Sequence, residues 1–375
     1  MKYLVSCLLL FFSISCKKEQ TTENFLAVAL TSKDPRIKNV VDSIAKYKVQ
    51  LQYVKINRIG DSIQFKTFNF QVDSSVYFYP ASTVKLPTAV AALEKLNAID
   101  TLTLDTKFYV EGDTTVTTFS SCIRDIFAVS DNAANNRLVE FLGFDDLNHR
   151  LKRTGIGPVR ISHRLSTDQA DQLHSQPLLI YQNDSTVSPT PKLLSTAPTP
   201  LSLKEIEKGI GYVEDNEIIM EPFDFSLKNH FPIQSQTALL KRIFFPEVFP
   251  KKERFNLTTN QLNFLREAMA VLPHQQGYDR SMYYDSYVKF FMYGDQKEAI
   301  PKHIKIYNKV GYAYGTLTDT AYIVDSKNDI EFILSGTILV NQDGIFNNDN
   351  YEYDSIGIPF LAQLGRVIYA QYLPE

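Results

Sequence analysis

Residues 78–85 read FYPASTVK and lead directly into an apolar run at 86–96. The apolar spacing predicts a helix that begins near this point, and it places Ser82 and Lys85 on one helical face. A serine hydroxyl is a weak nucleophile until a base takes its proton, and a lysine becomes such a base when burial lowers its pKa. A helix N-terminus also directs free N–H groups toward developing negative charge. The stretch therefore predicts a nucleophilic serine with a lysine partner.

The serine–lysine spacing indicates a catalytic site only in combination with two motifs farther along the chain. By itself it is a weak signal, because it recurs at Ser15, Ser43 and Ser286. The motif SDN follows at 130–132 and the motif KVG at 309–311. Together the three segments supply a nucleophile, a base, a second hydroxyl and a strand lysine. This ordered set predicts a site that forms a covalent acyl ester on the serine.

The residues around each motif extend the pattern. Residues 130–136 read SDNAANN and lead into LVEFLG at 138–143, and residues 309–321 read KVGYAYGTLTDTA. With 78–85, these segments resemble the motifs of the class A β-lactamases and penicillin-binding proteins, a family of penicillin-recognising serine hydrolases. The resembling region runs from about residue 78 to residue 324 and implies a β-lactamase/transpeptidase-like fold.

The resemblance implies a catalytic role for three residues. Ser82 would be the nucleophile, and Lys85 would be its basic partner. Ser130 would pass a proton to the leaving nitrogen. We therefore expect these three side chains to lie together.

Four further positions would bind the substrate by the same resemblance. Asn132 would hydrogen-bond the amide side chain of the substrate, and Lys309 would anchor both the second serine and the substrate carboxylate. Gly311 and Tyr312 continue the strand motif. The oxyanion hole would consist of the backbone N–H groups of Ser82 and Tyr312, because a tetrahedral intermediate needs two converging donors.

Two positions depart from the family pattern. Class A β-lactamases hydrolyse the acyl ester with water activated by a glutamate in an R-x-x-x-x-E-x-x-L-N pattern, but residues 157–168 contain no glutamate. Asp168, Asp171 or His163 would have to take that role, although each is more often a surface residue. Val310 stands where the family has Ser or Thr, and its methyl groups cannot donate to a substrate carboxylate. Acylation and turnover are therefore separate predictions.

Strand patterns occur near both ends of the chain. Alternating apolar and polar residues predict a hairpin from 49–59 and 63–70, with its turn at Gly60. Three successive antiparallel strands are predicted near the C-terminus, at 303–308, 318–324 and 330–341. The fold class is therefore α+β, with an antiparallel sheet built from N- and C-terminal segments, flanked by helices and carrying an inserted all-α lobe.

Helical periodicity fills the middle and the end of the chain. Helices are predicted at 37–48, at 123–141 with a break at 130–132, at 237–244, at 261–271 and at 355–372. Residues 175–200 are dense in Pro, Ser and Thr, which predicts a long surface insertion. The predicted α/β part covers about 35–80 and 300–375, and the helical lobe covers about 81–299.

Composition limits the possible partners. The 375 residues carry 39 Lys and Arg against 42 Asp and Glu, so there is no basic surface for nucleic acid. No Cys/His cluster has the spacing of a zinc site, so neither a metal nor a cofactor is expected. We expect a monomer whose partner is a small-molecule or peptidoglycan-peptide substrate.

The N-terminus has the features of a targeting segment. Lys2 gives a positive start, residues 4–12 are apolar, and small residues precede Cys16. This resembles a bacterial lipoprotein signal, in which the cysteine becomes the lipidated first residue. The alternative is a secretory signal that is cut elsewhere.

The domain division follows from that interpretation. Residues 1–15 would be the signal peptide, 16–34 a tether and 35–375 the hydrolase domain. Cys122 would be the one remaining free thiol, which excludes an intrachain disulfide. We expect a lipid-anchored protein of the bacterial cell envelope, in the periplasm or on the outer membrane.

Three functions remain open at this point. The leading one is a serine hydrolase that acts through an acyl ester on Ser82, and its simplest specific form is a β-lactamase. The second is a D-alanyl-D-alanine peptidase or esterase that a β-lactam acylates persistently. The third is an envelope binding module without catalysis.

Overall fold

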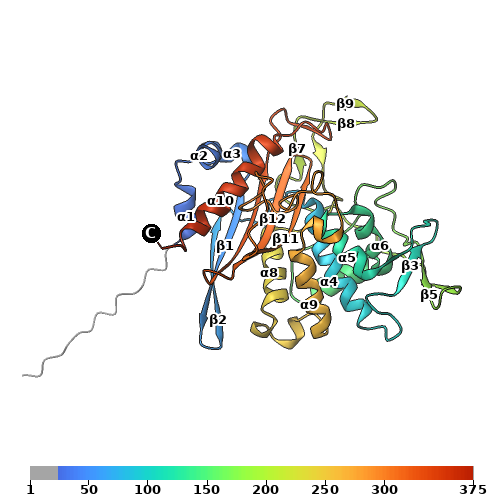
Figure 1. Cartoon of the computed structure of the whole chain (residues 1–375). Coiled ribbons are helices and arrows are strands. Elements are labelled where there is room, and N and C mark those ends of the chain that lie inside the picture. Colours follow the sequence, from blue (N-terminus) through green and yellow to red (C-terminus); the bar gives the residue numbers. More distant parts are fainter. Residues whose placement is uncertain (1–23, 375) are drawn as a thin grey trace, which may run out of the picture.

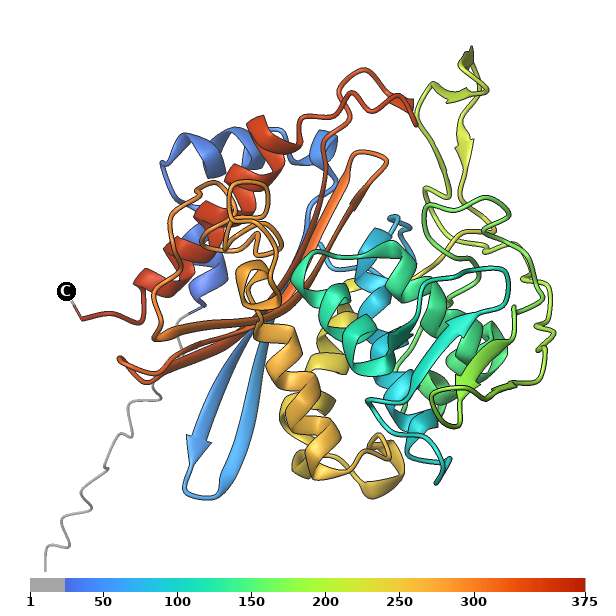
Figure 2. The same cartoon turned by 45° about the vertical axis from the view of Figure 1, so that its right-hand side comes forward.

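The computed structural model describes residues 24–374, so the predicted signal peptide at 1–15 and Cys16 lie outside the described residues. A five-stranded antiparallel sheet with the order β11-β12-β13-β1-β2 forms the centre. Figures 1 and 2 show the first and last helices of the chain on one face of this sheet and a larger helical lobe on the other. This arrangement confirms the predicted α+β fold class.

Both ends of the chain contribute strands to the sheet. β1 (Gln50–Ile59) and β2 (Ser62–Phe70) form the N-terminal hairpin, which turns through Gly60 at a φ of 57°. β1 also pairs with β13, and Leu51 lies opposite Gly336 in that register. The C-terminal strands are β11 (Ile304–Ala313), β12 (Thr316–Asp325) and β13 (Ile330–Leu339). The predicted hairpin and the three predicted strands are confirmed, and β11 extends through the KVG motif.

In the described part of the chain, four helices cover the outer face of the sheet: α1 (Phe25–Leu30), α2 (Pro35–Val41), α3 (Ile44–Tyr47) and α10 (Ile358–Ala370). The prediction of a tether through residue 34 is therefore wrong for the described part of that segment. Leu26 and Ala29 are buried in the core beneath this layer, and Asn24 caps α1 by accepting from the Ala27 amide at 3.1 Å. Burial of these apolar side chains stabilises a helix too short to form alone.

The inserted lobe carries six longer helices. They are α4 (Lys85–Leu96), α5 (Phe119–Ala128), α6 (Asn132–Leu142), α7 (Phe144–Arg153), α8 (Ile233–Phe244) and α9 (Thr259–Ala270). α4 is buried over nearly its whole length and packs against α6 and α7. The helix that follows the serine–lysine motif is therefore the central helix of the lobe.

The lobe is not purely helical, and this corrects the predicted all-α insertion. β3 (Lys107–Val110) pairs with β5 (Leu178–Tyr181), which pairs with β6 (Val187–Pro189). Most of the predicted surface insertion at 175–200 thus runs beside the lobe as an edge hairpin. Leu178 and Ile180 are buried in the lobe core, and this burial holds the hairpin in place.

Two further small sheets are formed by short strands. One joins β7 (Glu207–Lys208) to β10 (Phe223–Asp224), and the other joins β8 (Gly211–Glu214) to β9 (Glu217–Ile219) and β14 (Ile345–Phe346).

Within residues 24–374, no helix combines the length and the apolar character needed to cross a membrane.

Candidate active site

The three predicted motifs meet at one cleft of about 780 Å³. Ser82 lies on a 3₁₀ turn, Ala81–Val84, that runs directly into α4, and Lys85 is the first residue of that helix. Ser130 lies in the short connection between α5 and α6, and Lys309 lies in β11. Both serines line the cleft. The structure therefore brings together the residues that the sequence singled out, while their roles stay predictions.

A glycine lets β11 approach the serine turn. A Cβ atom on Gly311 would lie 2.6 Å from the Pro80 carbonyl oxygen and 3.0 Å from the Ser82 backbone nitrogen. Any side chain here would push the strand away from the turn, because backbone atoms cannot yield as a flexible side chain does. The glycine of the KVG motif thus sets the distance between the lysine strand and the serine.

Backbone strain is concentrated beside the same residues. Ala81 has a φ of 46° and Ser130 a φ of 60°. For a residue other than glycine, this left-handed conformation is less stable than the usual ones by about 1–3 kcal/mol. Such strained residues are often found at catalytic sites. The backbone is therefore strained at Ser130 itself and at the residue directly before Ser82.

Lys85 is fully buried and reaches the SDN motif with its ammonium nitrogen. Nζ donates to Asn132 Oδ1 at 2.6 Å, to Ser130 Oγ at 3.2 Å and to the Ser130 carbonyl oxygen. Burial lowers the pKa of Lys85 to about 7, and the charge of Asp131 opposes this only in part. Near neutral pH, a large share of this side chain is therefore the uncharged amine that can accept a proton.

Lys309 approaches the same hydroxyl from the sheet. Its Nζ donates to Ser130 Oγ at 2.8 Å and to the Val310 carbonyl oxygen at 2.9 Å. Burial, and then the charge of Lys85, hold the pKa of Lys309 well below its ordinary value. The Ser130 hydroxyl thus lies between two buried lysines, where it can exchange protons with either.

The SDN motif is fixed by the start of α6. Asp131 is the N-cap and accepts from the Ala134 amide at 2.6 Å. One turn later, Asn136 donates to the Leu165 carbonyl oxygen at 2.8 Å and accepts from the Leu165 amide at 3.0 Å. The helix that presents Asn132 therefore also holds the segment around residue 165 against the cleft.

That segment contains the three candidates for activating a deacylating water. Asp168 and Asp171 are exposed and are not among the residues that line the cleft, whereas His163 lines it. Sequence reasoning missed the adjacent ion pair, in which Arg164 donates to both carboxylate oxygens of Glu140. No spacing rule links two residues of opposite charge that are 24 positions apart.

Aromatic side chains form much of the cleft wall, and the sequence did not predict this. The tyrosines among the lining residues are Tyr79, Tyr283, Tyr287, Tyr312, Tyr314, Tyr351 and Tyr353. Tyr312 is 48% exposed, and its ring lies edge-on to that of Tyr353 with the centroids 5.5 Å apart. A wall of this kind suits a ligand with an apolar side chain next to polar groups.

Val310 faces away from this cleft. It is 1% exposed and belongs to the apolar core on the outer side of the sheet. The position that carries Ser or Thr in the resembling family therefore supplies no hydroxyl donor here.

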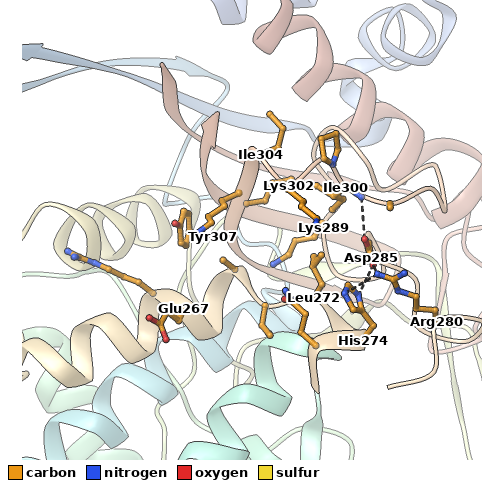
Figure 3. A pocket seen from close by; sticks show the side chains of 18 of the residues that line it. Glu267, Leu272, His274, Arg280, Asp285, Lys289, Ile300, Lys302, Ile304 and Tyr307 are labelled. Carbon is orange, nitrogen blue, oxygen red and sulfur yellow. Dashed lines mark hydrogen bonds and ion pairs between the residues drawn. The ribbon is translucent and has the colours of Figure 1, made fainter. Parts of the chain in front are cut away.

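A second cavity of about 660 Å³ opens between α9 and the beginning of β11 (Figure 3). Its lining residues include no serine, threonine or cysteine. The buried Lys289 at this cavity donates to the Met269 carbonyl oxygen at 2.9 Å and to Asn308 Oδ1 at 2.7 Å. Asn308 in turn donates to Asp319 Oδ1 at 2.8 Å, so the network braces β11 beside Lys309.

Comparisons with known proteins agree with this geometry. Residues 34–194 match the family model described as the β-lactamase enzyme family. A comparison with curated proteins found no match.

Solved structures of β-lactamases superpose over nearly the whole chain. The class A β-lactamase from Mycobacterium abscessus has a TM-score of 0.53 at 15% identity, over 92% of this chain and 97% of that one. The β-lactamase from Burkholderia ambifaria has a TM-score of 0.51 at 12% identity, over 93% and 99%. The β-lactamase from Streptosporangium roseum has a TM-score of 0.51 at 14% identity, over 89% and 97%. The resemblance stated from the motifs is confirmed: the chain has the fold of the class A β-lactamases, and residues 34–194 match the model of the β-lactamase enzyme family.

Proposed function

We propose that the protein is a serine hydrolase that forms an acyl ester on Ser82, with a β-lactam ring as its substrate. The observation that carries this proposal is the shared hydroxyl of Ser130, which accepts hydrogen bonds from Lys85 and Lys309 at the wall of the cleft that contains Ser82. A purely structural serine has no need of two buried lysines, since burying each lysine costs solvation free energy.

Acylation follows from this arrangement. Lys85, as a neutral amine, takes the proton of Ser82, and the freed Oγ attacks the carbonyl carbon of the substrate. Negative charge then develops on the carbonyl oxygen, where the backbone N–H groups of Ser82 and Tyr312 would stabilise it. When the C–N bond breaks, Ser130 gives its proton to the leaving nitrogen and regains one from a neighbouring lysine.

One competing function is supported by a specific observation. Val310 offers no donor for a substrate carboxylate, and residues 157–168 lack the glutamate that drives deacylation in the family. Both features favour a peptidase or esterase on which a β-lactam ester persists. The binding-module alternative would require that the nucleophile, both lysines and the second serine are retained without being used.

A single experiment separates these functions. The purified protein and a Ser82→Ala variant are incubated with a fluorescent penicillin, and intact mass and drug consumption are followed over time. We expect a transient adduct and consumed drug with the wild type and no adduct with the variant. A lasting adduct would support the peptidase, and no adduct in either protein would favour a binding module.

Envelope anchoring through Cys16 is also a proposal. It rests on the apolar segment at 4–12 that precedes this cysteine. Expression of wild type and Cys16→Ala with a labelled fatty acid tests it, because only the wild type should incorporate the label and sediment with membranes. Incorporation by both proteins would refute the assignment.

A further inference from the structure

We propose that the cavity between α9 and the beginning of β11 is a binding site for an organic anion, in which an acidic group is joined to an apolar chain. Its volume of about 660 Å³ is that of a small-molecule site, for which about 300–1,000 Å³ is typical. The cavity shares no lining residue with the cleft that contains Ser82. The inference therefore does not depend on the proposed hydrolase function.

The lining of this cavity carries an excess of positive charge. Its acidic residues are Glu267 and Asp285. Its Lys and Arg residues are Arg266, Arg280, Lys289, Lys302 and Lys305. A concave site whose walls carry mostly one sign of charge concentrates ions of the opposite sign, so this cavity favours an anion.

The excess is a property of the cavity and not of the protein as a whole. The chain has the opposite balance, with 39 Lys and Arg against 42 Asp and Glu. The lining of the Ser82 cleft is balanced, with Arg164 and Lys228 against Asp131 and Asp349. An anion is therefore expected to prefer the cavity to the cleft.

One of the two acidic groups in the cavity is already paired. His274 Nδ1 lies 2.9 Å from Asp285 Oδ1, and the Ile300 amide donates to Oδ2 at 3.3 Å. Arg280 Nη2 lies 2.9 Å from His274 Nε2 and 3.7 Å from Asp285 Oδ1. Figure 3 shows the three side chains gathered on one side of the cavity. Because Arg280 offsets its charge locally, Asp285 opposes a bound anion only weakly.

Two lysines of the lining are available to a ligand. Lys302 and Lys305 are exposed, and neither side chain has a hydrogen bond or ion pair within residues 24–374. Arg266, in contrast, already donates to the carbonyl oxygens of Ile243 and Phe244. Each ammonium group has three donors, so both lysines can form charge-assisted hydrogen bonds with an acidic group.

Lys289 adds positive charge from within the wall. It is 1% exposed, so it acts on a ligand through its electric field and not by contact. Burial lowers the pKa of Lys289 to about 7, and only part of this side chain is charged near neutral pH. Even without Lys289, the lining has four Lys and Arg against two Asp and Glu.

Much of the remaining wall is apolar. Ile300, Ile304 and Ile306 line the cavity, and so do Val271 and Leu272 from the segment that follows α9. An apolar chain that covers these side chains removes their remaining exposed surface from water, which favours binding. A small inorganic ion would leave this wall uncovered. The combination of available lysines and an apolar wall therefore fits an acidic group on an apolar chain.

The test uses decanoate as the probe, because it joins a carboxylate to an aliphatic chain. Decyltrimethylammonium carries the same chain with the opposite charge, and acetate carries the charge without the chain. Binding of each probe to the purified protein is measured by isothermal titration calorimetry at low salt, below the concentration at which the probe forms micelles. We expect decanoate to bind at least about 10-fold more tightly than either of the others.

A double variant, Lys302→Gln with Lys305→Gln, locates the site. It should bind decanoate about 10-fold more weakly than wild type, because two charges beside the carboxylate are lost. The matched control is Lys251→Gln with Lys252→Gln, which removes the same charge from two exposed lysines that do not line the cavity. The control should bind decanoate like wild type. Thermal unfolding verifies that both double variants are folded.

Three results would overturn the proposal. Wild type would fail to bind decanoate, or it would bind decyltrimethylammonium equally well, which would mean that the chain alone is recognised. Alternatively, both double variants would lose affinity to the same extent, which would assign the effect to the net charge of the protein. None of these results affects the Ser82 adduct, which tests the proposed function separately.

Discussion

Lys85 and Lys309 donate hydrogen bonds to the same oxygen atom, Ser130 Oγ, at 3.2 Å and 2.8 Å. Burial disfavours the charged form of each ammonium group, and at Lys309 the charge of Lys85 adds to this effect. The pKa of each lysine is accordingly lowered. A share of the Lys85 side chain is therefore an uncharged amine at Ser130 Oγ near neutral pH.

The rate of Ser82 acylation should rise with pH through about 7. Burial lowers the pKa of Lys85 to about 7, and only the neutral amine, which predominates above that pKa, can take the serine proton. The measurement is the rate of adduct formation with a fluorescent penicillin at a series of pH values on both sides of neutrality. Lys85→Arg, which stays charged, should be slower than wild type by about 10²–10⁴-fold at every pH. A flat wild-type profile would contradict the assignment of Lys85 as base.

Gly311→Ala should impair both stability and acylation. The new Cβ would lie 2.6 Å from the Pro80 carbonyl oxygen, so β11 has to move away from the serine turn. Such overpacking typically costs about 1–3 kcal/mol of unfolding free energy. Chemical denaturation and adduct formation measure the two effects. The control is Gly157→Ala, whose Cβ would meet no atom within 4 Å. Equal stability and equal acylation in the two variants would refute the idea that this contact positions the strand.

Sequence patterns predicted the parts of the fold that have regular periodicity. β1, β2 and the three C-terminal strands alternate or are rich in β-branched residues over nine or ten positions, which is long enough to be recognised. α1 escaped prediction because its six residues are helical only through burial of side chains such as Leu26 against the sheet. β5 is shorter still, with four residues, and the surrounding Pro and Ser obscured its alternation.

The sequence predicted the residues of the candidate site that stand in motifs of fixed spacing. It did not predict those that come from loops brought together by the fold. Ser82, Lys85, Ser130 and Lys309 stand in such motifs, and the fold brings them together. The aromatic wall comes mostly from irregular segments instead, and among its members only Tyr79, Tyr312 and Tyr314 lie within a motif segment. The place of His163 at the cleft depends on hydrogen bonds to the distant Asn229, which leave no periodic trace in the sequence.

Val310→Thr should destabilise the protein without improving acylation. It restores the residue type of the family, but the side chain lies in the apolar core on the outer side of the sheet. A hydroxyl buried there loses its hydrogen bonds to water and gains no partner in the apolar core. This lowers the free energy of unfolding by about 1–3 kcal/mol. Thermal unfolding and adduct formation with a carboxylate-bearing penicillin check this. A clear gain in acylation would show instead that residue 310 reaches the substrate.

The ion pair between Arg164 and Glu140 should contribute to stability in a way that a surface pair does not. Each side chain is only 8% exposed, and Arg164 Nη2 lies 2.9 Å from Glu140 Oε2. Glu140→Gln leaves the buried guanidinium without a countercharge, so we expect a loss of about 3–5 kcal/mol in unfolding free energy. Urea denaturation measures it, and a double variant with Arg164→Met and Glu140→Met should recover part of the loss because no unpaired charge remains.

The matched control for that pair is Lys38 with Asp42, whose side chains are each 55% exposed. Asp42→Asn should cost less than about 1 kcal/mol, because water screens an exposed pair and solvates the partner that is left. If Glu140→Gln cost no more than Asp42→Asn, the buried pair would not be what holds the segment of residues 157–168 at the cleft. The segment would then be held by its other contacts, such as those of Leu165 with Asn136 and of His163 with Tyr79 and Asn229.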